Sequence, residues 1–177
     1  MSRYTIGAVF TNNQGSAYTI TAKATEPRYW HVRFESGFTT VAKETNILYG
    51  KVKDYTHPTV YGVGYLGAAI RIPGRDEGSL LRRKYDLWAN MLKRVYGGYP
   101  DTWGADYSDV QVAPEWHSFA AFALELEDVV GYEAWVLDSH MCLDKDLARK
   151  RLYSRGTCKF VTCAENLSEA STRRWHG

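Results

Sequence analysis

The chain has 177 residues, 45% of them hydrophobic, and a formal net charge of +2. This length and apolar content can bury the core of one compact domain or two small ones, which excludes a fully disordered protein. There is no run of about 18 apolar residues to span a bilayer, and the first residues lack the apolar segment of a signal peptide. We therefore expect a soluble, intracellular protein with no membrane partner.

The small net charge hides a strong asymmetry along the chain. Residues 1–70 carry +3 and residues 71–100 carry +4, whereas residues 101–144 hold ten acidic residues and no basic one, and residues 145–177 carry +5. Basic flanks can neutralise phosphates and add sequence-independent affinity for nucleic acid. The acidic block 101–144 is expected to face solvent, bind cations, or pair with basic surface in this protein or on a partner.

Residues 1 to about 70 have the composition of β structure. Short segments rich in β-branched or aromatic residues are punctuated by turn sequences, which predicts a small β barrel or curled sheet. The segments are 4–6, 9–10, 18–21 and 30–34, with a continuation at Val41, 47–49 and 60–61.

The hydrophobic period changes near Pro73-Gly74, which predicts a boundary between a β-rich module, residues 1–72, and a second region, residues 73–177. From Ser79 onward apolar residues recur at helical spacing, and Gly97-Gly98 is a suitable end for this helix. These apolar residues are Leu81, Tyr85, Trp88, Leu92 and Val95. A second helix is predicted from Pro114 to Val130, since proline suits the first helical turn.

The three cysteines, Cys142, Cys158 and Cys163, form no CxxC pair. An odd number without paired spacing predicts reduced thiols in a cytosol rather than a disulfide framework. A zinc site that combines them with His140 or His176 is an alternative, although the paired spacing typical of zinc motifs is absent.

The last third of the chain carries an ordered set of polar motifs: Leu143-Asp144-Lys145-Asp146, Tyr153-Ser154, Thr157-Cys158-Lys159-Phe160-Val161-Thr162 and Glu165-Asn166. This order resembles the strand, loop, strand and helix of the bacteriophage HNH-like (ββα-metal finger) homing-endonuclease family. Upstream segments are also similar to that family, including Tyr85-x-x-Trp88-x-x-Met91-Leu92-x-Arg94-x-Tyr96 and Asn46-Ile47-x-x-Gly50-x-Val52-Lys53-Asp54. The resemblance therefore covers most of the chain.

The resemblance implies an α+β protein with an N-terminal DNA-binding β module, central helices and a C-terminal HNH-like finger. Its activity would be divalent-metal-dependent hydrolysis of DNA phosphodiesters in the cytoplasm of an infected bacterial host. The metal, Mg²⁺ or Mn²⁺, would be held by Asp144 at the end of a strand and Asn166 in the first turn of a helix. Carboxylate and amide oxygens are ligands that Mg²⁺ accepts.

The chain departs from the family at the catalytic base. The residue after the aspartate is normally histidine and here is Lys145, and the asparagine that orients the histidine is replaced by Thr157. An ordinary lysine titrates near ~10.4, too high to accept a proton from water at neutral pH. We therefore expect Lys145 to act as a phosphate clamp or transition-state cation rather than as the general base. His140 is a poor substitute, because its odd offset from Lys145 would point it to the opposite face of a continuous strand.

Two functions follow from these residues. The first is a DNA endonuclease whose basic side chains bind the phosphates of double-stranded DNA; the candidates are Arg82, Arg83, Lys84, Lys93, Arg94, Arg149, Lys150, Arg151 and Arg155. The second is a catalytically inactive HNH-fold protein that binds DNA, or inhibits a host protein through the acidic block with Glu125, Glu127 and Asp128. The same basic residues could also be a solvated helix surface.

Overall fold

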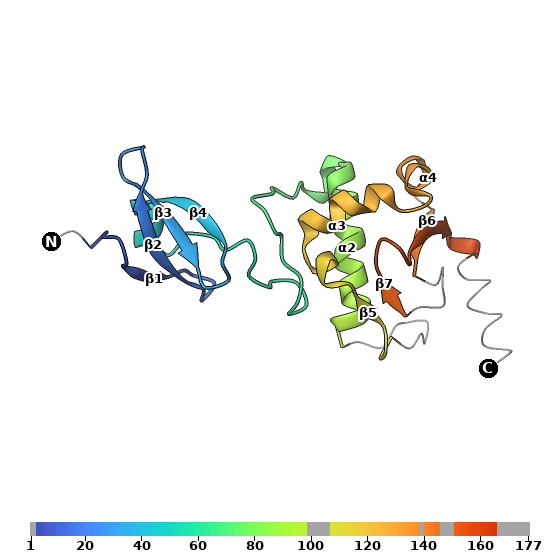
Figure 1. Cartoon of the computed structure of the whole chain (residues 1–177). Coiled ribbons are helices and arrows are strands. Elements are labelled where there is room, and N and C mark those ends of the chain that lie inside the picture. The colour runs from blue at the N-terminus through green and yellow to red at the C-terminus, as the bar shows by residue number, and fades with distance from the viewer. Residues whose placement is uncertain (1–2, 99–106, 139, 146–150, 166–177) are drawn as a thin grey trace. The chain divides into compact units, whose positions relative to one another are not determined.

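The computed structural model describes residues 3–98, 107–138, 140–145 and 151–165. The chain divides into two compact units, Met1–His57 and Pro58–Gly177, which we call the N-terminal unit and the C-terminal unit. The protein is of the α+β class, with a four-stranded antiparallel sheet in the first unit and helices with two short strand pairs in the second (Figure 1).

The N-terminal unit is an open antiparallel meander with strand order β1-β2-β3-β4. Its elements are β1 (Val9–Thr11), β2 (Ala17–Lys23), β3 (Tyr29–Phe34), β4 (Thr39–Lys43) and α1 (Glu44–Leu48). The strands coincide with the predicted β segments, except that the residues before Val9 contain no strand in the described part. The predicted β structure is thus present as a four-stranded meander with β1 and β4 at its edges, and these two strands do not pair to close a barrel.

Side chains alternate across this sheet and place one face in a hydrophobic core. Tyr18 lies opposite Phe34 and Ile20 opposite Val32, and all four are buried. The same core receives Ala42, Ile47 and Val52. Successive side chains of a strand point to opposite faces, so the residues between these positions face outward.

The predicted continuation of β structure at 47–49 and 60–61 is wrong. Ile47 and Leu48 lie in α1, and Ile47 turns inward to complete the core. Val60 makes only an isolated bridge to Gly64, around a tight turn in which Tyr61 has a φ of 50°. A residue with a positive φ lies outside the β region of backbone conformation, so a strand cannot continue through Tyr61.

The C-terminal unit begins well before the change of period at Pro73. The backbone of Tyr65 donates to the carbonyl of His117 at 3.0 Å and accepts from Phe119 at 2.8 Å. A side chain at Gly64 would collide with Leu92 and Trp88, so the bare backbone is needed for this close approach. These contacts tie the segment 58–72, which the sequence pattern grouped with the β module, to the helical core.

The elements of the C-terminal unit are η1 (Arg75–Glu77), α2 (Leu80–Tyr96), β5 (Gln111–Val112), η2 (Pro114–His117), α3 (Phe119–Glu125), η3 (Leu126–Asp128), α4 (Tyr132–Leu137), β6 (Met141–Asp144), β7 (Leu152–Tyr153) and β8 (Lys159–Thr162). Strands β5 and β7 pair in parallel, and β6 and β8 pair antiparallel. Within the described residues, none of the helices has the length and apolar character needed to cross a membrane.

The predicted first helix is confirmed as α2, and its apolar stripe packs in an aromatic core. The predicted second helix from Pro114 to Val130 is instead a 3-10 turn, α3 and another 3-10 turn. The break falls at Ser118, which has extended backbone and accepts a hydrogen bond from the amide of Ala121 at 3.4 Å. Serine is a favoured residue at a helix start, so it begins a new helix here.

Candidate functional site

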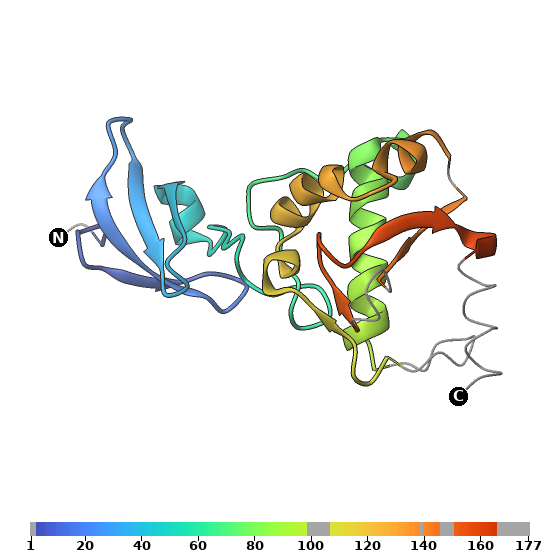
Figure 2. The same ribbon diagram turned by 45° about the vertical axis from the view of Figure 1, so that its right-hand side comes forward.

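The pair formed by β6 and β8 positions the first predicted site residue. Met141 lies opposite Thr162, and the ladder ends where Asp144 lies opposite Lys159. Figure 2 shows this antiparallel pair, β6 in orange and β8 in red. Directly after β8 the chain becomes helical at residues 163–165. The order of strand, returning strand and helical turn is therefore present among the described residues.

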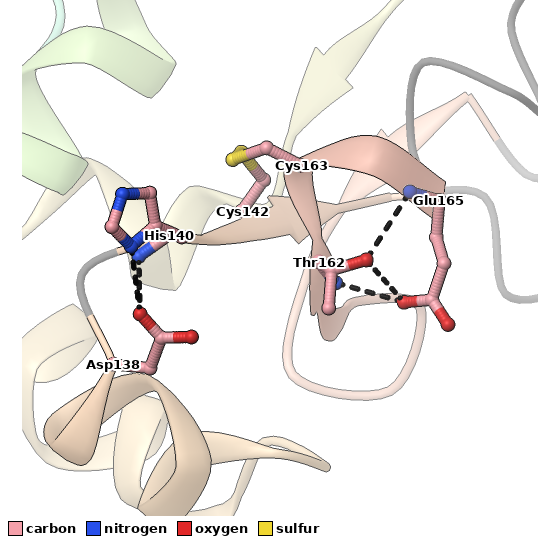
Figure 3. The surroundings of a disulfide bond; sticks show 6 residues. All are labelled: Asp138, His140, Cys142, Thr162, Cys163 and Glu165. Carbon is pink, nitrogen blue, oxygen red and sulfur yellow. Dashed lines mark hydrogen bonds and ion pairs between the residues drawn. A yellow bond between two sulfur atoms is a disulfide. The ribbon is translucent and has the colours of Figure 1, made fainter.

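A capping box sets the helical turn after β8. The amide of Glu165 donates to the hydroxyl of Thr162 at 3.2 Å, and the Glu165 carboxylate accepts from the Thr162 amide at 2.9 Å (Figure 3). The hydrogen bond from the Thr162 backbone lowers the pKa of the Glu165 carboxyl. Threonine followed three residues later by glutamate is a sequence signal for a helix start, and it would have located this turn from the sequence alone.

The expectation of three reduced thiols is wrong. Cys142 of β6 and Cys163, the residue after β8, form a disulfide with their Cα atoms 5.3 Å apart (Figure 3). The antiparallel register brings them together, because the amide of Cys163 donates to the carbonyl of His140, two residues before Cys142. The disulfide thus covalently joins the strand that ends in Asp144 to the start of the helical turn.

Asp144, the last residue of β6, and Lys145, which follows the strand, have different surroundings. Asp144 is buried, with 5% of its surface exposed. Lys145 is half-buried, and its ammonium group lies 5.4 Å from the ring centre of Tyr107 and 5.9 Å from that of Tyr153. Aromatic faces at such distances attract a cationic group. This environment suits a fixed cation better than a general base.

Two buried groups next to this pair are held in their neutral forms. Burial raises the pKa of the Cys158 thiol to about 12; the Asp144 carboxylate adds to this increase, and the Lys145 ammonium opposes it. Burial also raises the pKa of Tyr153, with a further increase from Tyr107. A protonated thiol is a poor nucleophile and metal ligand. With Cys142 and Cys163 in a disulfide, the alternative of a cysteine zinc site loses its ligands.

Thr157, which stands where the family has its orienting asparagine, closes the loop between β7 and β8. Its hydroxyl donates to the carbonyl of Leu152 and lies 2.9 Å from the hydroxyl of Ser154. The side chain is 6% exposed. It therefore stabilises the loop that follows Tyr153, the β7 residue whose ring lies near Lys145.

Three of the predicted site residues, Asn166, Arg149 and Lys150, lie outside the described residues, as do Asp146 and His176. Among the residues that are described, no group of three or more His, Cys, Asp or Glu side chains could hold a metal ion. Asp144 offers the hard oxygen donor that Mg²⁺ requires, and Mg²⁺ commonly uses only one or two protein carboxylates.

The basic residues at the start of α2 are engaged within the C-terminal unit. Arg82 forms a two-pronged ion pair with Asp86, at 2.9 and 2.6 Å. Arg83 donates to the carbonyls of Trp135 and Val136 at 2.7 and 3.0 Å, which caps the end of α4. Arginine at a helix C-terminus satisfies carbonyls that have no partner within the helix.

Lys84 is a structural residue. It is 6% exposed, and its ammonium group donates to the carbonyl of Ala123 at 2.8 Å and to the carboxylate of Glu127 at 2.6 Å. The same ammonium lies 5.0 Å from the ring centre of Tyr132. We therefore leave Lys84 out of any surface that could contact phosphate.

The four other candidates within the described residues, Lys93, Arg94, Arg151 and Arg155, are exposed. Lys93 and Arg94 lie near the end of α2, and Arg94 is hydrogen-bonded to Tyr153. Arg151 forms an ion pair with Asp109, and Arg155 forms one with Asp128 at 3.1 Å. Surface pairs of this kind are weak and can exchange for phosphate.

His140 is exposed and lies before β6 rather than within it. Its ring nitrogen Nδ1 is 3.0 Å from the carboxylate of Asp138, which also accepts from the His140 amide (Figure 3). These two hydrogen bonds lower the pKa of Asp138. The histidine thus forms a local turn with Asp138. That His140 does not replace the missing catalytic base stays a prediction.

Comparison of the chain with protein-family models, with curated proteins and with solved structures finds no significant match.

Proposed function

We propose that this protein is a DNA-binding endonuclease of the HNH-like type, with Asp144 and Lys145 at its reaction centre and Asn166 as a second metal ligand. The observation that carries this proposal is the arrangement of β6, β8 and the capped turn at 163–165. It places a buried carboxylate, Asp144, at the end of the first strand and a helix start directly after the second. This is the order that the sequence motifs require.

The residues of the site have distinct tasks in this proposal. Asp144 would bind Mg²⁺ or Mn²⁺, a group that supplies Lewis-acid stabilisation of the phosphate and lowers the pKa of water. Lys145 would hold the scissile phosphate through charge, since its ammonium lies against Tyr107 and Tyr153 and is oriented by both rings. A cation placed where negative charge develops lowers the barrier without transferring a proton.

A nicking assay on supercoiled plasmid with Mg²⁺ or Mn²⁺ tests the assigned ligands. We expect Asp144→Asn and Asn166→Ala each to lose at least about 100-fold in rate, because loss of groups that only orient a metal ligand already costs about 10- to 100-fold. The matched control is Asp138→Asn, which makes the same change at an exposed carboxylate nearby. Equal activity in all four proteins would eliminate the assigned site.

Substitution of Lys145 distinguishes its role as a phosphate-binding cation from a role as the general base. Arginine keeps the positive charge and the contact with aromatic rings, but it cannot accept a proton at any accessible pH. We expect Lys145→Arg to retain most of the nicking activity and Lys145→Ala to lose most of it. Loss of activity in both variants would point to proton transfer by Lys145.

A catalytically inactive DNA-binding protein is the second candidate, and the replacement of both base and orienter by Lys145 and Thr157 favours it. Salt-dependent DNA binding without nicking in Mg²⁺ or Mn²⁺ would support it over the nuclease. For the inhibitor version, the residues expected to contact a host protein would have to exchange the internal partners that they have in this structure. Glu125 accepts from the indole of Trp116 at 2.9 Å, Glu127 pairs with Lys84 and Asp128 pairs with Arg155.

A further inference from the structure

The face of the N-terminal sheet that points away from its core has a composition unlike the rest of the molecule. We call it the outer sheet face and define it by Thr19 of β2, His31 and Arg33 of β3, and Thr39, Val41 and Lys43 of β4. Five of these six side chains are polar or basic and none is acidic; five of the six are exposed, and Thr19 is half-buried. None of the residues in β1 to β4 is acidic.

The basic side chains of this face are not used to stabilise the unit. Among the described residues, neither Arg33 nor Lys43 forms an ion pair, and the Lys43 ammonium lies 5.9 Å from the ring centre of Tyr29. Glu44, the acidic residue next to Lys43, instead accepts a hydrogen bond from the indole of Trp30 at 3.1 Å. The positive charge of the face is therefore not neutralised by this neighbour.

The cross-strand register determines which side chains are neighbours on this face. Arg33 lies between Thr19 and Thr39, one on each neighbouring strand, and His31 lies opposite Val41. A long cationic side chain thus stands between two short hydroxyl side chains. Arginine can bind guanine edges or phosphate, and threonine can contact phosphate or the methyl group of thymine.

The dimensions fit one form of nucleic acid. Neighbouring strands lie about 4.8 Å apart, and the basic residues Arg33 and Lys43 both lie on one such pair, β3 and β4. The major groove of B-form DNA is about 12 Å wide and admits a two-stranded β-ribbon, whereas the major groove of duplex RNA is too deep and narrow for side chains to read. We propose that the outer sheet face docks in the major groove of duplex DNA, with Arg33 and Lys43 neutralising phosphates or contacting base edges. This proposal rests on the DNA binding proposed above and assigns its surface.

Fluorescence anisotropy of the full chain with a mixed-sequence DNA duplex, measured over a range of salt concentrations, tests the assignment. We expect the double variant Arg33→Thr and Lys43→Thr to bind more weakly and to lower the slope of log K against log salt by about 1.8, since each neutralised phosphate contributes about 0.9. Threonine preserves strand propensity, so the sheet should remain folded. The converse variant Val41→Lys, at a side chain that is 48% exposed, should raise the slope by about 0.9.

The matched control removes the same charge elsewhere in the unit. Lys51 and Lys53 are exposed and flank Val52, which packs on the inner face of the sheet, so Lys51→Thr with Lys53→Thr should leave the slope unchanged. If the wild-type chain binds DNA and both double variants behave alike, the outer sheet face is not the docking surface, although the proposed function survives. If the wild-type chain binds no duplex DNA, the proposed function fails as well. Equal competition by a duplex RNA would overturn the major-groove assignment.

Discussion

The two units use their basic residues in opposite ways. In the C-terminal unit, Arg82, Arg83 and Lys84 bind carboxylates or carbonyls of the same unit. In the N-terminal unit, Arg33 and Lys43 stand on an exposed sheet face that carries no acidic side chain. A count of charges along the sequence treats both sets alike as phosphate contacts. The difference shows that charge alone does not identify a phosphate contact, because a basic side chain that is buried against internal acceptors, as Lys84 is, is not available to a partner.

The units also differ in how they are held together. The N-terminal unit contains no cysteine, whereas the disulfide of the C-terminal unit joins Cys142 to Cys163 across 21 residues. Closing a loop of this size lowers the entropy of the unfolded chain, with an expected effect of about 3 kcal/mol. We therefore expect reduction, or Cys142→Ser with Cys163→Ser, to lower the free energy of unfolding of the C-terminal unit by about 3 kcal/mol and to leave the N-terminal unit unchanged.

Urea unfolding with and without a reducing agent, followed by tryptophan fluorescence and circular dichroism, would measure this effect. In the double serine variant the reducing agent should have no further effect, which controls for damage elsewhere. Three titratable thiols in the unfolded but unreduced protein would contradict the disulfide itself.

The structural use of Lys84 gives the next largest effect. Lys84→Ala leaves the carbonyl of Ala123 without this donor and removes the ion pair to Glu127, so we expect a loss of about 2 kcal/mol in stability, as for a hydrogen bond to a charged group. Lys93→Ala, an exposed lysine on the same helix, is the matched control and should change stability by less than about 0.5 kcal/mol.

DNA affinity distinguishes a structural role of Lys84 from a role as a phosphate contact. After correction for the folded fraction, Lys84→Ala should bind DNA like the wild-type chain. If instead it stays fully stable and its salt slope falls, Lys84 contacts phosphate and the comparison between the units is wrong.

Local pattern accounts for much of the fold. The strands around Tyr18 and Val32 followed from β-branched and aromatic residues between turn sequences, and α2 followed from the spacing of Leu81 to Val95 with glycine at its end. The break at Ser118 did not follow, because the apolar positions keep helical spacing across it. Two short helical segments that pack against the same core show the same hydrophobic pattern as one long helix. Only the capping residue between them distinguishes the two cases.

The long-range features could not be read from the sequence. The disulfide depends on the register of β6 and β8, which composition does not specify, and the contact of Lys145 with Tyr107 joins residues 38 positions apart with no shared motif. The burial of Lys84 likewise depends on its ion pair with Glu127, which lies in η3 and is distant in the sequence. Of the assigned site, the strand end at Asp144 was predictable, but the aromatic surroundings of Lys145 were not.

The smallest expected effect concerns the core of the N-terminal unit. The hydroxyl of Tyr18 is buried without a hydrogen-bond partner among the described residues, in contrast to the buried polar groups Lys84 and Thr157 of the C-terminal unit. Because an unpaired hydroxyl disfavours the folded state, we expect Tyr18→Phe to raise the stability of this unit by about 1 kcal/mol. Tyr55→Phe, at a half-buried ring of the same unit, is the control and should change it little.

The pH dependence gives an independent check on the same group. Burial raises the pKa of Tyr18 from 10.0 to about 12, so the unfolded chain loses this proton first as the pH rises. The folded state therefore binds more protons between these two values, and stability falls with increasing pH across that window. Tyr18→Phe should remove this part of the alkaline loss, measured by urea unfolding at pH values below and within the window. An unchanged alkaline loss in the variant would indicate that Tyr18 does not carry it and that its hydroxyl is reached by water in solution, because a hydroxyl buried away from water must keep its proton to a higher pH than an exposed one.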